Sequence, residues 1–264
     1  MSRFRANLAI ATLLFALFGG TVQAIAQTGE VVEVVQPARL YLDGKQTRLN
    51  VGDRVRVGDT VLTGEGAMAQ IIFQDETKIV VGPNAQMKLD ELIFRKDNTA
   101  RKFAVNATRG TFRFLSGKSP SEAYTVRTPI ATMGVRGTVF DFTIPTERNT
   151  DLLVHEGEVQ FCRRGRSRCA AVPMGCQTVR MDHRRWNQPK TESERSQILN
   201  ALFPFALEQE NLRPAFRTNI SACSESGSDR TLPQVRVRSA SSDPLSGGGG
   251  AGTRGSTRSA NPAE

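Results

Sequence analysis

The sequence is poor in histidine and in the larger aromatic side chains. Its 264 residues include two His, two Tyr and one Trp, so the 14 Phe supply most of the aromatic bulk. His155 and His183 leave little material for a histidine metal site or a hydrolase with a catalytic histidine. No run of 18 apolar residues occurs, so no membrane-spanning helix is expected. These shortages argue against most enzymes, and the sequence implies no catalytic residue, metal or cofactor.

Positive charge is concentrated in one short segment. The chain carries a net charge of +9, yet residues 27–161 are neutral. Residues 162–190 hold eight Lys and Arg against Asp182 alone, which gives +7. The densest part is a predicted basic patch consisting of Arg163, Arg164, Arg166 and Arg168. Such a patch suits anionic headgroups, phosphates or acidic protein surfaces, although an arginine-rich hairpin can also serve solubility alone.

The N-terminus has the pattern of a secretory signal peptide. Arg3 and Arg5 precede an apolar stretch at residues 8–18, and small residues follow. Ala24 and Ala26 lie three and one residues before a cut after Ala26, and a cut after Ala24 is the alternative. We therefore expect residues 1–26 to be removed on export to the periplasm, with no transmembrane span left after processing.

The four cysteines suit an oxidising compartment. Cys162 and Cys169 flank a short polar loop, so a hairpin would place them opposite each other. We predict a Cys162–Cys169 disulfide and, from the remaining pair, a Cys176–Cys223 disulfide. The alternative is a zinc site, but structural zinc favours more closely spaced cysteine pairs.

The mature chain alternates apolar and polar residues up to Met181, which predicts short strands with one buried face. Phe112 and Phe114 share one side of a strand while Thr111 and Arg113 take the other. Residues 156–157 read as a turn. The pattern predicts an all-β fold, either a compact many-stranded sandwich or a short β-solenoid.

A small helical appendage is expected at residues 183–223, after a β domain at residues 27–182. Thr191 and Glu194 fit a capping box, and an apolar stripe from Ile198 to Phe203 stops at Pro204. We expect the stripe to pack on the β body, with the second disulfide tying the appendage back. Residues 224–264 are rich in Ser, Gly and Arg and are predicted to be disordered.

One segment, TVRTPIATMGVRGTVF at residues 125–140, resembles the signature of the FecR domain, a periplasmic β-rich module. Residues 51–75, 155–159 and 174–179 are also similar to that family, so the resemblance covers about residues 45–182. The signature positions are Thr128, Pro129, Val135, Arg136, Gly137 and Thr138. Arg136 is either a structural clamp or a ligand contact.

The resemblance implies a sensing role. The family's namesake members join a cytoplasmic segment that acts on a sigma factor, a single membrane span and a periplasmic sensing part. Seven residues precede the apolar stretch here, so we expect a free-standing periplasmic module. It would contact an envelope protein or an anionic envelope polymer, and its oligomeric state is open.

The sequence also bears on two other functions. A carbohydrate-active or other envelope hydrolase would use surface carboxylates such as Asp75, Glu76, Asp90 and Glu91. Nucleic-acid binding is not expected, because Trp186 is the one aromatic residue in the basic segment and stacking platforms need several.

Overall fold

The structure is a computed structural model that describes residues 28–224, 231–232, 234–235 and 237–239. The predicted signal peptide and its cleavage after Ala26 lie outside the described residues. Among the helices of the described part, none is long and apolar enough to cross a bilayer.

The described residues form sixteen strands and a few short helices. The strands are β1 (Thr28–Val35), β2 (Ala38–Leu42), β3 (Lys45–Arg48), β4 (Arg54–Arg56), β5 (Thr60–Thr63), β6 (Met68–Phe73), β7 (Lys78–Val81), β8 (Gln86–Phe94), β9 (Ala100–Leu115), β10 (Tyr124–Arg127), β11 (Ala131–Thr146), β12 (Asn149–Arg163), β13 (Arg168–Pro173), β14 (Gln177–Met181), β15 (Trp186–Asn187) and β16 (Val237–Ser239). The helices are η1 (Ser121–Ala123), α1 (Glu192–Leu202), α2 (Pro204–Leu207), η2 (Pro214–Phe216) and α3 (Ser221–Ser224).

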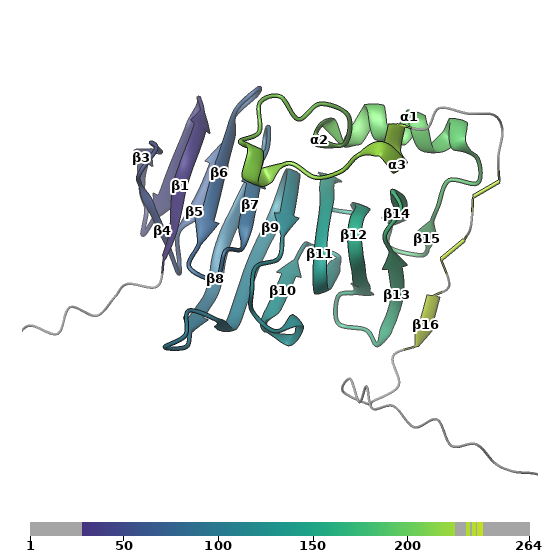
Figure 1. Cartoon of the computed structure of the whole chain (residues 1–264), viewed down its shortest axis with the longest axis horizontal. Coiled ribbons are helices and arrows are strands. Elements are labelled where there is room, and N and C mark those ends of the chain that lie inside the picture. Colours follow the sequence, from purple (N-terminus) through teal and green to yellow (C-terminus); the bar gives the residue numbers. More distant parts are fainter. Residues whose placement is uncertain (1–27, 225–230, 233, 236, 240–264) are drawn as a thin grey trace, which may run out of the picture.

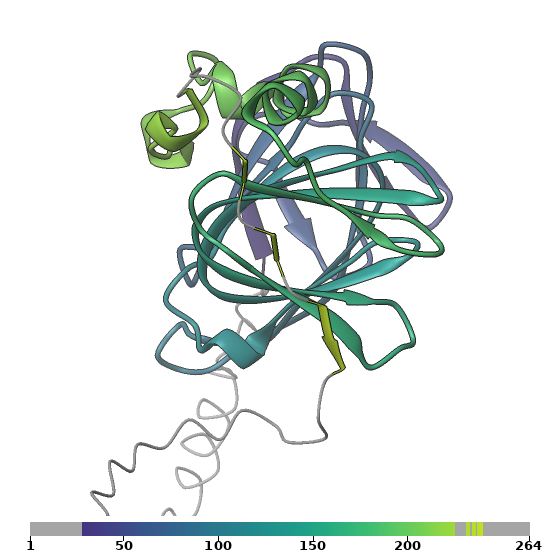
Figure 2. The ribbon, with the colours of Figure 1, turned by 90° about the vertical axis from the view of Figure 1, so that its right-hand side faces the viewer.

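The all-β prediction is confirmed, and strand pairing divides the sheet into two layers, which corresponds to the sandwich of the two predicted arrangements (Figure 1). The helix-covered layer runs β4, β1, β6, β7, the second halves of β9 and β11, the first half of β12, β14 and β15. The open layer runs β3, β2, β5, β8, the first half of β9, β10, the first half of β11, the second half of β12, β13 and β16. Figure 2 views the molecule along the direction in which the strands of Figure 1 follow one another, and there the strands surround the core.

Three long strands belong to both layers, and each changes layer at a glycine. Gly110 in β9, Gly137 in β11 and Gly157 in β12 have φ angles of 94°, 55° and 73°. This left-handed region is costly for residues with a Cβ, so glycine permits the bend without ending the strand. The turn predicted at residues 156–157 is therefore a bend within the continuous strand β12.

The core between the layers is built from phenylalanines. Phe73 of the helix-covered layer meets Phe103 of the open layer edge to face, with ring centroids 4.7 Å apart. Phe112 and Phe114 point inward as predicted, and both are buried. Such aromatic pairs add to the hydrophobic stabilisation of the two layers.

The helical appendage covers the outer face of one layer (Figures 1 and 2). Thr191 caps α1 by accepting a hydrogen bond from the Glu194 backbone N–H. Leu199 and Phe203 are buried against Leu153 of β12. The apolar stripe of α1 packs on the β body, as predicted.

The prediction of a disordered tail from residue 224 does not hold at the later positions that the structure describes. Residues 237–239 form β16, which pairs with the open edge of β13. Leu232 is buried, and its backbone N–H donates to the Lys190 carbonyl over 2.8 Å. An unpaired edge of β13 would leave backbone groups without partners, and the alternating Val235 and Val237 suit a strand there.

Candidate functional site

The Thr-Pro part of the family signature forms the turn between β10 and β11. Thr128 is fully buried, its backbone N–H donates to the Ala131 carbonyl, and its Oγ1 accepts a hydrogen bond from the Ala131 N–H over 3.0 Å. Thr128 Oγ1 also lies 2.9 Å from Thr150 Oγ1 of β12. Pro129 holds Thr128 extended before the turn. This part of the signature therefore has a structural explanation.

The Val-Arg-Gly-Thr part lies where β11 changes layer. Val135 and Thr138 are buried on either side of the bend at Gly137. The Thr138 carbonyl accepts a hydrogen bond from the backbone N–H of Ser116, in the loop after β9, and the Thr138 N–H donates to Ser116 Oγ over 2.8 Å. The backbone of Arg136 pairs opposite Glu158, whereas its side chain lies outside the described part of the structure. Its role as a clamp or a ligand contact stays a prediction.

The hairpin of β12 and β13, whose loop lies at one end of the sandwich, carries the basic patch (Figure 1). Arg163 ends β12, Arg164 and Arg166 lie in the loop, and Arg168 begins β13. A second arginine-bearing loop, between β14 and β15, lies beside it. The two loops are joined because an Arg163 Nη1–H donates to the His183 carbonyl. Arg184 and Arg185 of the second loop thereby join the predicted patch. We call these two loops, with Trp186, the basic end.

Trp186 is the centre of the basic end. The guanidinium carbons of Arg163 and Arg168 lie 5.0 and 5.5 Å from the centroid of the Trp186 ring. Both distances are within range for a cation–π interaction. Arg164 Nη1–H donates to the Thr128 carbonyl over 3.1 Å, which anchors the loop to the signature turn. Three of the four predicted arginines thus have contacts within the molecule.

The remaining cations of the basic end are available to a partner. Arg166, Arg184 and Arg185 are exposed, and their side chains make no hydrogen bond or ion pair with other described residues. Asp182, the acid of this segment, accepts hydrogen bonds from the backbone N–H groups of Arg184 and Arg185, and these lower its pKa. The sequence alone indicates the first loop as the basic patch and does not show that Arg184 and Arg185 lie beside it.

Both predicted disulfides are present. Cys162 and Cys169 lie opposite each other on β12 and β13, and a disulfide joins them next to the loop between these two strands. Cys176 is bridged to Cys223 of α3, which attaches the appendage to the β body. The described part of the chain has no free cysteine, and it holds no group of three or more His, Cys, Asp or Glu arranged for a metal ion.

A buried polar cluster lies between the helix-covered layer and the appendage. Arg113 of β9 donates to both carboxylate oxygens of Asp141 of β11 over 2.6 and 2.8 Å. Arg113 also donates to the Phe205 carbonyl over 2.7 Å, and His155 Nε2 lies 2.9 Å from Asp141 Oδ2. Burial alone would raise the pKa of Asp141, but the Arg113 guanidinium and then His155 outweigh it, and the pKa falls to about 2. The cluster anchors the appendage and is closed to solvent.

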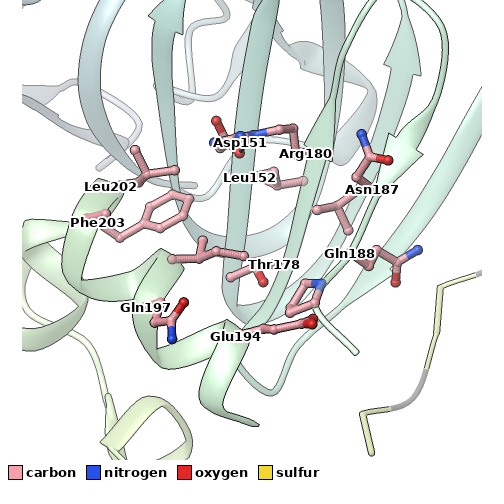
Figure 3. Close-up of a pocket in the computed structure, with 14 residues that line it drawn as sticks. Asp151, Leu152, Thr178, Arg180, Asn187, Gln188, Glu194, Gln197, Leu202 and Phe203 are labelled. Atoms are coloured by element: carbon pink, nitrogen blue, oxygen red, sulfur yellow. Dashed lines mark hydrogen bonds and ion pairs between the residues drawn. The ribbon is translucent and has the colours of Figure 1, made fainter. Parts of the chain in front are cut away.

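A cavity of about 410 Å³ opens between α1 and strands β12, β14 and β15 (Figure 3). Leu202 of α1 and Phe203, which follows α1, lie on one side of it, and Asn187 and Gln188 lie on the other. The Asp151–Arg180 ion pair, with Arg180 Nε 2.6 Å from Asp151 Oδ1, lies at one end. The volume is within the range of small-ligand pockets. Sequence reasoning missed this cavity because α1 and β14 supply opposite walls.

The carboxylates considered for a hydrolase do not converge. Asp75 is fully buried and accepts hydrogen bonds from the hydroxyls of Ser119 and Tyr124 over 2.6 and 2.8 Å. Asp90 and Glu91 face Arg127 at 3.6 and 3.7 Å. None of these acids lines the cavity beside α1. A glycosidase needs two carboxylates on one cleft, so these residues give the alternative no support.

Comparison with known proteins identifies one family. Residues 59–160 match the family model described as FecR protein, which confirms the predicted resemblance over that range. Two solved structures, both of a provisionally assigned anti-sigma factor from Parabacteroides distasonis ATCC 8503, are similar, with 16% and 15% identity and TM-scores of 0.40 and 0.38. Each match covers 49% of this chain and 58% of the other, less than two thirds of its length. No curated protein matches the chain.

Proposed function

We propose that this protein is a non-catalytic module for binding or sensing in the bacterial periplasm. Its basic end would contact an envelope protein or an anionic envelope polymer. The match of residues 59–160 to the FecR model supports a regulatory rather than an enzymatic role. The observation that carries the proposal is the meeting of two arginine-bearing loops at one end of the sandwich.

The chemistry of the basic end supports an anionic partner. The guanidinium groups of Arg166, Arg184 and Arg185 are exposed and unpaired among the described residues, so a phosphate or carboxylate can meet them without breaking an existing contact. Arginine binds such anions through two parallel hydrogen bonds. Arg163 and Arg168 hold the loops in place through Trp186, which reduces the ordering cost of binding.

The periplasmic location rests on two independent features. The first is the pattern of residues 1–26, which is typical of a cleaved signal peptide. The second is the pair of disulfides, which persist in oxidising compartments. We expect the mature protein to be recovered from the periplasmic fraction with Gln27 as its first residue.

In-cell crosslinking followed by recovery of the protein tests the proposal. The variant R166A/R184A/R185A removes three exposed charges from the basic end without touching the Trp186 contacts. The matched control K45A/R48A/R56A removes three exposed charges at the opposite end of the sandwich.

An envelope partner that is captured by the wild type and the control, but not by the basic-end variant, is the expected result. Capture by all three proteins would move the contact away from the basic end. Loss in both variants would show a dependence on net charge alone, and either result contradicts the proposal.

A further inference from the structure

Two residues that line the cavity beside α1 each have a buried side-chain oxygen atom that lacks a hydrogen-bond partner. Asp151 Oδ2 and Thr178 Oγ1 have no partner, and the two residues are only 3% and 4% exposed. Both residues lie on adjacent strands and line the cavity. A buried polar atom without a partner is costly and is uncommon in native proteins. Two such atoms beside one cavity therefore indicate a missing donor.

The rest of the cavity specifies the body of a ligand. Ile198 and Leu202 of α1 and Phe203, which follows α1, line the cavity on one side, and Pro189 of the segment before α1 also lines it. An alkyl or aromatic group would bury its surface against these side chains.

The charges around the cavity specify the head group. Asp151 and Glu194 are acidic and Arg180 is basic, so the lining carries one net negative charge. Burial raises the pKa of Asp151, and the Arg180 hydrogen bond and charge oppose the rise. The Arg180 side chain is 42% exposed, so it can shift to admit a second donor beside Asp151.

We propose that this cavity binds a primary amine with an apolar body, whose ammonium group donates to Asp151 Oδ2 and Thr178 Oγ1. An ammonium has three donors and no acceptor, which matches two unpartnered oxygens. A carboxylate head group would meet Asp151 with like charge. The site is separate from the basic end, so neither proposal depends on the other.

The test uses three probes with the same six-carbon body: hexylamine, 1-hexanol and hexanoate. Binding to the full mature protein is measured by isothermal titration calorimetry. Hexylamine is expected to bind at least about tenfold more tightly than hexanol, since hydrogen bonds between charged groups are stronger than neutral ones. Hexanoate is expected not to bind. Equal affinities for all three probes, preference for hexanoate, or no binding of hexylamine would overturn the proposal.

Three variants locate the site. Asp151→Asn is expected to abolish the preference for hexylamine, whereas Arg180→Gln is expected to strengthen hexylamine binding because it removes the competing cation. Ala201→Phe, at an exposed position of α1 on the cavity wall, should block all binding and leave the fold intact. Unchanged affinity in Ala201→Phe, or weaker hexylamine binding in Arg180→Gln, would contradict the assignment even if Asp151→Asn failed to fold.

Discussion

Arg113 and Asp141 lie directly opposite each other on β9 and β11 and form a doubly hydrogen-bonded ion pair in which neither side chain is exposed. The pair lies on the outer face of the helix-covered layer, where a strand residue would normally meet water. The appendage covers it instead, and Arg113 donates to the Phe205 carbonyl. One buried pair therefore joins two parts of the chain that are almost a hundred residues apart.

Removing one member of this pair should be severely destabilising. In Asp141→Asn the Arg113 charge stays buried without its counterion, and we expect a loss of about 3–5 kcal/mol in the free energy of unfolding. Urea denaturation measures the loss. The matched control is Asp90→Asn, which breaks the partly exposed Asp90–Arg127 pair and should cost less than about 1 kcal/mol. Similar losses in both variants would contradict an anchoring role for Arg113 and Asp141.

The same pair predicts how stability depends on pH. The pKa of Asp141 falls from 3.8 to about 2 on folding, so its ionised form stabilises the native state above the unfolded value. This contribution, about 2 kcal/mol, should be present at pH 5 and lost as the pH falls towards 2. Urea titrations at several pH values should therefore show a shallower acid decline for Asp141→Asn than for the wild type. Parallel declines would contradict the lowered pKa.

Alanine substitutions at the glycine bends are expected to destabilise the protein by different amounts. Gly137→Ala should lower the free energy of unfolding by about 1–2 kcal/mol because φ is 55°, which is unfavourable for alanine. The backbone conformation is the whole cost, since the new Cβ meets no atom within 4 Å. Gly110→Ala should cost more, because its Cβ would lie 2.3 Å from the Ala85 Cα. Gly134→Ala, on the same strand as Gly137, is the control and should be nearly neutral. Thermal unfolding that ranked the three variants in another order would contradict the role of the bends.

The two disulfides should contribute unequally. The Cys176–Cys223 bridge closes a span of 47 residues and the Cys162–Cys169 bridge a span of 7. Chain entropy then gives about 4 kcal/mol for the first and about 2 kcal/mol for the second. The paired variants C176S/C223S and C162S/C169S, compared by urea unfolding, test this order. A greater loss in C162S/C169S would show that chain entropy does not govern these bridges.

The local pattern of the sequence predicts much of the fold. Alternation at Phe112 and Phe114 identifies the inner face of β9 because each strand buries its own alternate residues. The spacing of Cys162 and Cys169 predicts their bridge because the hairpin that joins them is only a few residues long. The cap at Thr191 is equally local.

Other features depend on residues far apart in the chain. The alternation of β9 places Arg113 towards solvent, and only the appendage explains its burial. The layer change at Gly157 reads as a turn in the sequence because a bend within a strand and a turn between strands use the same residue. The cavity at Asp151 needs α1 and three strands, so no single motif indicates it.

Site-specific photocrosslinking in living cells tests the central claim most directly. A photoreactive residue replaces Arg166, at the exposed tip of the basic end, or Arg48 as the control at the opposite end. The account predicts a discrete envelope adduct from position 166, weaker at raised ionic strength because exposed charges are screened, and none from position 48. No adduct at position 166, or the same adduct from both positions, would contradict it.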